Sequence, residues 1–168
     1  MNTDTAVNRI DADTRSRMKQ FARGEMTWAE VEGMTYEQAN AIATVGCELA
    51  AKGRLQEARI IFEGLVAGNP KDSSATSCLG GVYQKLGRKQ DALDCYTRAI
   101  ELLPENVVAL AARGELRLRG NDRKGIEDLA MAAKLDEKGV TAGGRRARAL
   151  IVAMVQHAAQ VNKAKARR

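Results

Sequence analysis

The sequence predicts an all-α chain of three stacked helix–turn–helix units, with one further helical segment at each end. Three observations lead to this prediction. Small residues recur every 34 residues, aromatic residues make up only 4% of the chain, and two Thr-x-x-Glu/Gln motifs stand near the N-terminus. A chain poor in aromatic residues and rich in alanine favours closely packed helices over a β-sandwich. Its 168 residues are enough to bury a core.

Capping signals predict the N-terminal helices. Residues 12–23 are expected to form a helix with its apolar residues on one side. Thr27–Glu30 and Thr35–Gln38 each match a capping box, in which two side chains satisfy backbone N–H groups at a helix start. The first box opens a short turn of helix, and the second opens the first helix of the first repeat. We therefore assign residues 1–34 to an N-terminal helical extension.

A 34-residue spacing then defines the repeats. The residues that align at this spacing are Gly46, Gly80 and Gly114; Gly53, Gly87 and Asn121; Ala58, Ala92 and Ile126; Phe62, Tyr96 and Ala130; Leu65, Ala99 and Ala133; and Pro70, Pro104 and Lys138. Agreement at several offsets is more specific than any short motif. We predict repeats over about residues 39–72, 73–106 and 107–138 within a repeat domain of residues 35–138.

The recurring positions have physical roles. A glycine or alanine on the first helix of a repeat lets the second helix approach closely. Gly53 and Gly87 end the first helices, where a left-handed residue is wanted. Pro70 and Pro104 stop the second helices. Because one repeat cannot bury its apolar face alone, neighbouring repeats are expected to stack into a superhelix with a concave groove.

The last helix is expected to close the stack. Its apolar residues follow helical spacing and are Ala147, Leu150, Ile151, Met154, Val155 and Ala158. They predict a capping helix over residues 139–160 that lies on the third repeat, followed by a basic frayed tail over residues 161–168. Residues 145–168 hold seven basic residues and no acidic ones. We expect this end to aid solubility rather than bind nucleic acid, because no aromatic residue interleaves the basic ones.

The composition also limits the classes of function. His157, the only histidine, has no Cys, Asp or Glu close in sequence, so no metal site is expected. The glycine pairs at 80–81 and 143–144 lack the context of a phosphate-binding loop. We therefore expect no enzyme activity, no cofactor and no small-molecule substrate. The three cysteines occur singly, which predicts buried thiols in a reducing cytosol, and no segment is long and apolar enough to span a membrane.

The repeat pattern resembles the tetratricopeptide repeat, a helix–turn–helix unit of the same period. The resemblance covers about residues 39–138, and the second repeat carries it most completely through Leu79-Gly80, Tyr83, Gly87, Ala92, Tyr96, Ala99 and Pro104. It implies that a ligand lies in the concave groove, which is lined by the first helix of each repeat.

Helical geometry assigns the lining of that groove once the packing positions are removed. The candidate peptide-binding residues are Asn40, Ala43, Cys47 and Ala50 in the first repeat; Ser77, Gly81, Gln84 and Lys85 in the second; and Ala111, Glu115 and Leu118 in the third. This lining is small and mildly apolar, with few charges. No cluster of basic bidentate donors is visible that would clamp a peptide carboxylate, so we expect an apolar peptide.

The arrangement resembles a narrower family, the class II chaperones of bacterial type III secretion. The match rests on Gly33, Gly53, Ala58, Phe62 and Leu65 and on three repeats with a helix at each end. The resemblance implies a cytoplasmic protein that holds a hydrophobic translocator protein before its export. It also implies dimers formed through the N-terminal helix, for which Met18, Phe21 and Trp28 are the candidate contacts.

Two alternatives remain open from the sequence. The chain is either such a chaperone or a general scaffold that holds partners in a secretion, pilus or regulatory complex. A chaperone keeps one aggregation-prone client soluble, whereas a scaffold binds folded partners that are stable alone. Trp28 likewise has two interpretations, since it either covers the open edge of the first repeat or forms a dimer contact.

Overall fold

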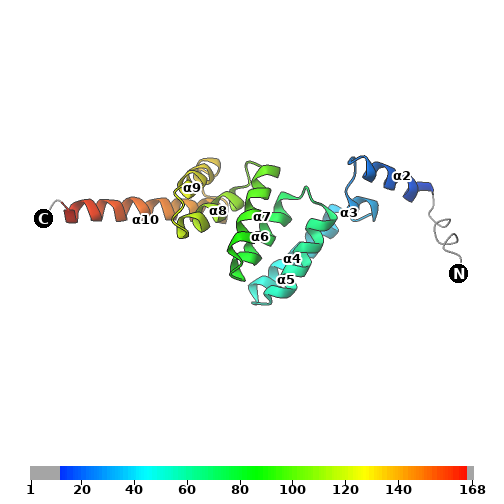
Figure 1. Ribbon diagram of the computed structural model, residues 1–168, viewed down its shortest axis with the longest axis horizontal. Helices are drawn as coiled ribbons and strands as arrows, with labels where there is room; N and C mark the ends of the chain where they lie inside the picture. The colour runs from blue at the N-terminus through cyan, green and yellow to red at the C-terminus, as the bar shows by residue number, and fades with distance from the viewer. Residues whose placement is uncertain (1–11, 166–168) are drawn as a thin grey trace. The chain divides into compact units, whose positions relative to one another are not determined.

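The computed structural model describes residues 12–165, and within that range it contains helices and no strands. The helices, labelled in Figure 1, are α2 (Ala12–Ala22), α3 (Trp28–Val31), α4 (Tyr36–Ala51), α5 (Leu55–Gly68), α6 (Ser73–Lys85), α7 (Lys89–Leu102), α8 (Val107–Arg119), α9 (Lys124–Leu135) and α10 (Ala142–Lys165). The chain divides into two compact units between Lys71 and Asp72. We call them unit 1 and unit 2 and describe each by itself.

Unit 1 begins with two helices whose starts match the predicted capping boxes. The Thr27 hydroxyl accepts from the Glu30 N–H at the start of α3. The Thr35 hydroxyl accepts from the Gln38 N–H at the start of α4 in the same way. Arg17 on α2 donates to the Val31 carbonyl at 2.9 Å and so ties α2 to the end of α3. Both predicted capping boxes are confirmed.

The helix pair α4 and α5 forms the rest of unit 1 and lies side by side (Figure 1). A Cβ atom added at Gly46 would lie 2.9 Å from the Phe62 ring, so the glycine makes room for that ring. Gly53 follows α4 with a φ of 78°, in the left-handed region that favours glycine. The two predicted glycine roles are therefore confirmed in the first repeat.

Unit 2 repeats this design and extends it. On α7, Ala92, Tyr96 and Ala99 are buried and pack with Ala109 and Leu116 of α8. A second cluster joins three helices and consists of Leu110, Ala111, Leu129, Ala132 and Ala147. The core of unit 2 is thus continuous from α7 through α8 and α9 to α10, and small alanine side chains keep these helices close.

The second helix of the third repeat differs from prediction by one residue. The 34-residue spacing selects Ile126, Ala130 and Ala133, but the buried residues are their predecessors, Gly125, Leu129 and Ala132. Measured from Ala92, Tyr96 and Ala99, the spacing here is 33 residues. Gly87 and Asn121 both have a positive φ and keep the 34-residue spacing, so one residue is missing between Asn121 and Gly125, and the helix keeps its packing face. The predicted assignments at 126, 130 and 133 are therefore wrong.

A buried ionic cluster replaces part of the apolar packing in the third repeat. Asp128 of α9 is 6% exposed and accepts from Arg113 at 2.7 and 2.9 Å and from Arg117 at 2.8 Å. Both arginines lie on α8. The carboxylate is thus paired by two guanidinium groups, which a buried charge requires. Arg117 stands where the second repeat has Tyr83.

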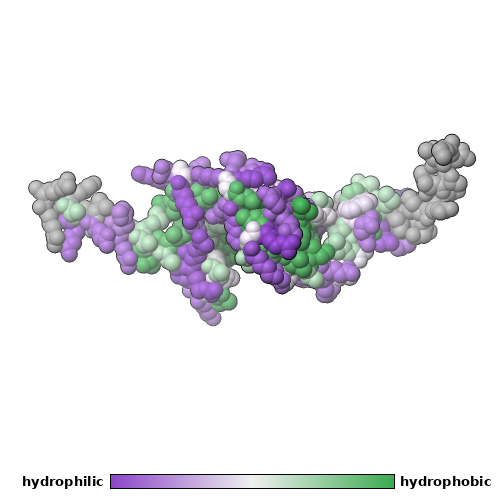
Figure 2. Space-filling model, turned by 90° about the horizontal axis from the view of Figure 1, so that it is seen from below, coloured by the Kyte–Doolittle hydropathy of each residue, from purple (hydrophilic) through white to green (hydrophobic). Residues whose placement is uncertain are grey.

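The last helix, α10, packs on unit 2 through its first half only. Ala147 is fully buried, whereas Val152 and Val155 are 53% and 64% exposed. Figure 2 shows hydrophobic residues on the part of α10 that extends away from α8 and α9, between hydrophilic ones. The predicted contact of Val155 and Ala158 with the third repeat is wrong. The helix continues to Lys165, beyond the predicted end at Gln160, and residues 166–168 of the predicted tail lie outside the described residues.

The cysteines are less buried than predicted. Cys47 is exposed, and Cys78 and Cys95 are half-buried. None of the three forms a disulfide in the structure. Cys47, which is also one of the predicted groove residues, lies on the surface of α4.

Candidate functional site

A cavity of about 680 Å³ lies in unit 2 between α6, α8 and the start of α10. We call it the α6–α8 cavity. Its lining residues are Gly81, Gln84, Lys85, Tyr96, Val108, Ala111, Ala112, Glu115, Arg119, Ala142, Gly143 and Arg146. Residues of four helices, α6, α7, α8 and α10, therefore contribute to one site, and most of its wall comes from the first helices of the second and third repeats.

The cavity brings together part of the predicted groove. Five of the predicted residues line it, namely Gly81, Gln84, Lys85, Ala111 and Glu115. Ser77 is buried on α6 outside the lining, and Leu118 packs toward Gly125 in the α8–α9 core. The first-repeat residues all lie on α4 in unit 1, where Asn40 and Cys47 are exposed and Ala43 and Ala50 are half-buried.

Glu115 organises the charged side of the cavity. It is buried, and its Oε1 accepts from Arg119 at 2.6 Å and from Arg146 at 2.8 Å. The Arg146 Nε lies 2.5 Å from the Glu115 Oε2, so this arginine holds both carboxylate oxygens. Hydrogen bonding to Glu115 raises the pKa of Arg146. The cavity is therefore more charged than predicted, because Arg146 comes from α10, which the groove pattern did not include.

The lining also carries a neutral polar pair. The Tyr96 hydroxyl donates to the Gln84 Oε1 at 2.8 Å. Burial raises the pKa of Tyr96, so the phenol stays protonated and remains a donor. This bond orients the Gln84 amide.

The start of α10 sits close to α8 because its first residues are small. A Cβ atom added at Gly143 would lie 2.9 Å from the Val107 carbonyl oxygen. Asp136 caps the same segment by accepting from the N–H groups of Val140 and Thr141 at 2.8 Å and from the Thr141 hydroxyl at 2.7 Å. The Thr141 hydroxyl is the largest cause that lowers the pKa of Asp136. These contacts hold Arg146 at the edge of the cavity.

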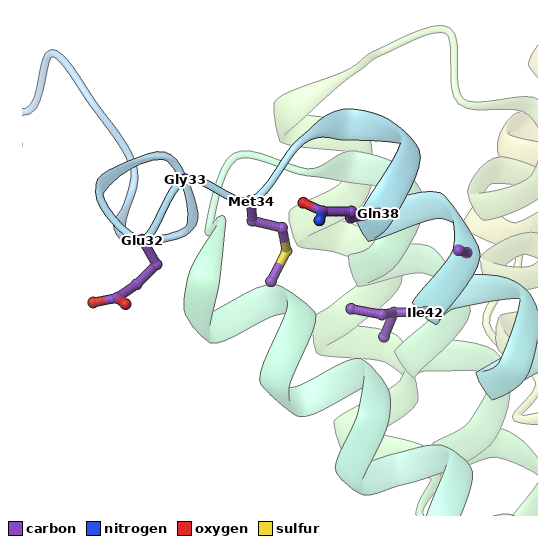
Figure 3. A pocket seen from close by; sticks show the side chains of 6 residues that line it. Glu32, Gly33, Met34, Gln38 and Ile42 are labelled. Carbon is purple, nitrogen blue, oxygen red and sulfur yellow. The ribbon is translucent and has the colours of Figure 1, made fainter.

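Unit 1 has a second, smaller cavity of about 480 Å³. It is lined by Glu32, Gly33, Met34, Gln38, Ala41 and Ile42. Figure 3 shows Met34 and Ile42 pointing into the same space, whereas the carboxylate of Glu32 points away from it. The cavity thus offers an apolar interior, and it is not visible in the sequence pattern, because the N-terminal extension and α4 both contribute to it.

The candidate dimer residues lie on α2 and α3 of unit 1. Phe21 and Trp28 contact each other edge to face, with ring centroids 5.6 Å apart. These two residues and Met18 are each about two-fifths exposed. Trp28 therefore packs within its own chain and still presents part of its ring, and the dimer contact stays a prediction.

Residues 12–165 contain neither a metal-binding cluster nor a membrane-spanning helix. That part of the chain holds no group of three or more His, Cys, Asp or Glu residues placed to bind a metal ion. None of its helices combines the length and the apolar character needed to cross a membrane.

A family model agrees with the repeat pattern, and one relative is similar in sequence. The tetratricopeptide repeat model matches residues 75–106, which contain most of α6 and all of α7. Anaphase-promoting complex subunit 3 of Schizosaccharomyces pombe is 32% identical over 108 residues, which is 64% of this chain. The chain spans only 16% of the length of that relative.

Solved structures share the fold at low sequence identity. The type III secretion translocator chaperone SycD of Yersinia enterocolitica has a TM-score of 0.67 and 16% identity, covering 76% of this chain and 98% of SycD. PcrH in complex with the chaperone binding region of PopB has a TM-score of 0.62 and 22% identity, covering 70% and 97%. The Sgt2 TPR domain of Aspergillus fumigatus has a TM-score of 0.63 and 16% identity, covering 75% and 83%. The chain therefore contains a tetratricopeptide repeat at residues 75–106 and has the all-helical fold of tetratricopeptide-repeat proteins.

Proposed function

We propose that this chain binds a protein partner and receives a peptide segment of that partner in the α6–α8 cavity. One observation carries the proposal: the first helices of two successive repeats and the start of α10 enclose a cavity of about 680 Å³. This volume lies within the range of about 300–1,000 Å³ that is usual for ligand sites. The proposal involves no catalysis and no cofactor.

The chemistry of the wall suits a peptide. Val108 is 53% exposed and, with Ala111 and Ala112, offers an apolar surface for a small side chain. Gln84 and the guanidinium groups of Arg119 and Arg146 offer hydrogen-bond donors for peptide carbonyl groups. Apolar area supplies affinity, and a few fixed polar groups set the orientation of the ligand.

We further propose that the partner is a hydrophobic secreted protein held in the cytoplasm before export. The likeness to SycD, a translocator chaperone, and to PcrH bound to the chaperone binding region of PopB supports this proposal. The exposed apolar residues of unit 1, including Ile42 and Val45 on α4, offer further area for an apolar client. A homodimer through α2 and α3 is part of the same proposal.

A scaffold is the second candidate function. The sequence similarity to a subunit of the anaphase-promoting complex supports it. The two functions differ in the state of the partner, because a chaperone client aggregates when it is made alone and a scaffold partner does not. Co-expression of the captured partner with and without this chain, followed by measurement of its soluble fraction, separates them.

The binding site is tested by filling the cavity. Gly81 lines it, and a Cβ atom there meets nothing closer than the Tyr96 hydroxyl at 3.8 Å. A Gly81→Trp variant should therefore fold and yet block the cavity. Gly64→Trp is the matched control, because Gly64 lies on α5 with nothing within 4 Å of an added Cβ atom.

The expected result is that Gly81→Trp loses the partner in affinity purification from the source cells, while Gly64→Trp retains it. The helical circular dichroism signal of both variants should match that of the unmodified protein. Full retention of the partner by a folded Gly81→Trp variant would exclude the α6–α8 cavity as the binding site.

A further inference from the structure

We infer that the peptide segment bound in the α6–α8 cavity carries an Asp or Glu side chain two or three residues away from a small or medium apolar side chain. This inference rests on the proposed function, since it names the chemistry of the partner at the same site. It departs from the apolar peptide that the sequence pattern predicts.

The charge of the lining gives the first argument. Three of the lining residues are basic, namely Lys85, Arg119 and Arg146, and Glu115 alone is acidic. The formal charge of the cavity is thus +2. A partner of opposite sign is favoured by complementarity, and a basic segment is disfavoured.

The unused donors give the second argument. Within the described residues, Glu115 accepts one N–H group of Arg119 and two of Arg146. A guanidinium group has five N–H donors in a fixed plane, so both arginines keep donors for a second acceptor. Their side chains are 62% and 58% exposed, and the remaining donors can reach a ligand. A carboxylate matches such donors in geometry and in charge.

Glu115 also prepares this site. Its hydrogen bonds bring the guanidinium groups of α8 and α10 to one point, although both arginines would repel each other without it. A ligand carboxylate then meets two arginines whose positions are already set, so little conformational entropy is lost on binding. The start of α10, formed by Ala142 and Gly143, lies in the same lining and adds the positive end of a long helix.

The positions along α8 give the expected spacing. Val108 and Ala111 precede Glu115 by seven and four residues on the helix. At about 1.5 Å per residue, the apolar surface lies roughly 6–10 Å from the charged point. An extended peptide covers about 3.3 Å per residue, so an apolar and an acidic side chain two or three residues apart reach both.

The experiment is a selection of random twelve-residue peptides displayed on phage against the full-length protein. The peptides are fused at their C-termini, so no free peptide carboxylate is present and only side chains supply one. We expect the selected sequences to share an Asp or Glu two or three residues from Leu, Val or Ile. Binding of a selected synthetic peptide is then measured by fluorescence anisotropy, beside an analogue with Asn or Gln in place of the acid.

Matched variants assign the effect to the cavity. The amide analogue should bind about tenfold more weakly than the acidic peptide. Arg119→Ala should weaken the acidic peptide several-fold and leave the amide analogue nearly unchanged. Arg98→Ala, an exposed arginine of α7 outside the cavity, serves as the control.

The outcomes separate the inference from the proposed function. The inference would be overturned by selected peptides without an acidic residue, or by an acidic peptide whose affinity is the same for Arg119→Ala as for the unmodified protein. Either result would leave the cavity as a peptide site. A selection that yields no peptide, or peptides that still bind Gly81→Trp, would overturn the proposed site as well.

Discussion

Arg146 at the start of α10 holds both carboxylate oxygens of Glu115 on α8, with one contact of 2.5 Å and one of 2.8 Å. This pair connects the last helix to the third repeat at the edge of the α6–α8 cavity. It therefore serves two purposes, because it fastens α10 and fixes the position of a guanidinium group in the proposed binding site.

Because Glu115 holds α10 through Arg146, removing the charge of Glu115 should reduce the stability of the protein. Glu115→Gln should lower the free energy of unfolding by about 1 kcal/mol, since charge-assisted hydrogen bonds at a buried carboxylate are lost. Urea unfolding followed by circular dichroism measures this change. Glu101→Gln, which loses only an exposed pair with Arg98 at 3.3 Å, is expected to stay within about 0.5 kcal/mol. Equal effects of the two substitutions would contradict a role for Glu115 in holding α10.

Alanine substitution should change the stability of the protein in opposite directions at two adjacent glycines of α6. A Cβ atom at Gly80 would lie 2.8 Å from the Tyr96 ring, whereas at Gly81 the nearest atom is 3.8 Å away. Gly80→Ala should cost about 2 kcal/mol by overpacking. Gly81→Ala should gain about 0.5–1 kcal/mol, because alanine favours the helix. Thermal unfolding of both variants checks this, and stabilisation by Gly80→Ala would show that α6 and α7 are not packed as described.

The one-residue change in the third repeat can be tested in the same way. A Cβ atom at Gly125 would overlap the Gly114 carbonyl oxygen, whereas Ile126 is 43% exposed. Gly125→Ala should therefore destabilise the protein by at least about 2 kcal/mol, while Ile126→Ala should change stability by less than about 0.5 kcal/mol. Urea unfolding distinguishes the two. If Ile126→Ala destabilised the protein more than Gly125→Ala, the packing face of α9 would instead follow the 34-residue spacing.

Asp136 should contribute to the acid dependence of stability. Its hydrogen bonds to Thr141 and Val140 lower its pKa in the folded state. A lowered pKa means that the contribution is present above the unfolded-state pKa, near 4, and is lost as the pH falls through the folded-state value. Asp136→Asn should thus reduce stability at pH 7 and flatten its decline below about pH 4. Glu137→Gln is the control, because the Glu137 side chain is exposed and accepts no hydrogen bond within the described residues.

Much of the fold could be predicted because single residues carry its constraints. Gly46, Gly80 and Gly114 recur where two helices touch, and an added Cβ atom would meet a neighbour within 3.0 Å at each of them. Gly53 and Gly87 recur where the chain adopts a left-handed conformation. Such positions admit almost no other residue, so their spacing remains visible in one sequence.

The rest could not be predicted because it depends on contacts between distant segments. One residue is missing between Asn121 and Gly125 relative to the second repeat, which shifts the register of α9, and hydrophobic spacing alone does not show where a residue is missing. The pairing of Asp128 with Arg113 and Arg117 required the α8–α9 geometry. The charge of the cavity was missed because Arg146 belongs to a helix that the repeat pattern treats only as a cap.

The measurement that tests the account most directly is site-specific photocrosslinking in the source cells. Benzoylphenylalanine replaces Val108, which lines the α6–α8 cavity and is 53% exposed, or Arg98, which is exposed on α7 outside it. We predict that the protein labelled at position 108 forms an adduct with one dominant partner, and that the protein labelled at position 98 does not. Equal adducts from both positions, or an adduct from position 98 alone, would contradict binding in the cavity.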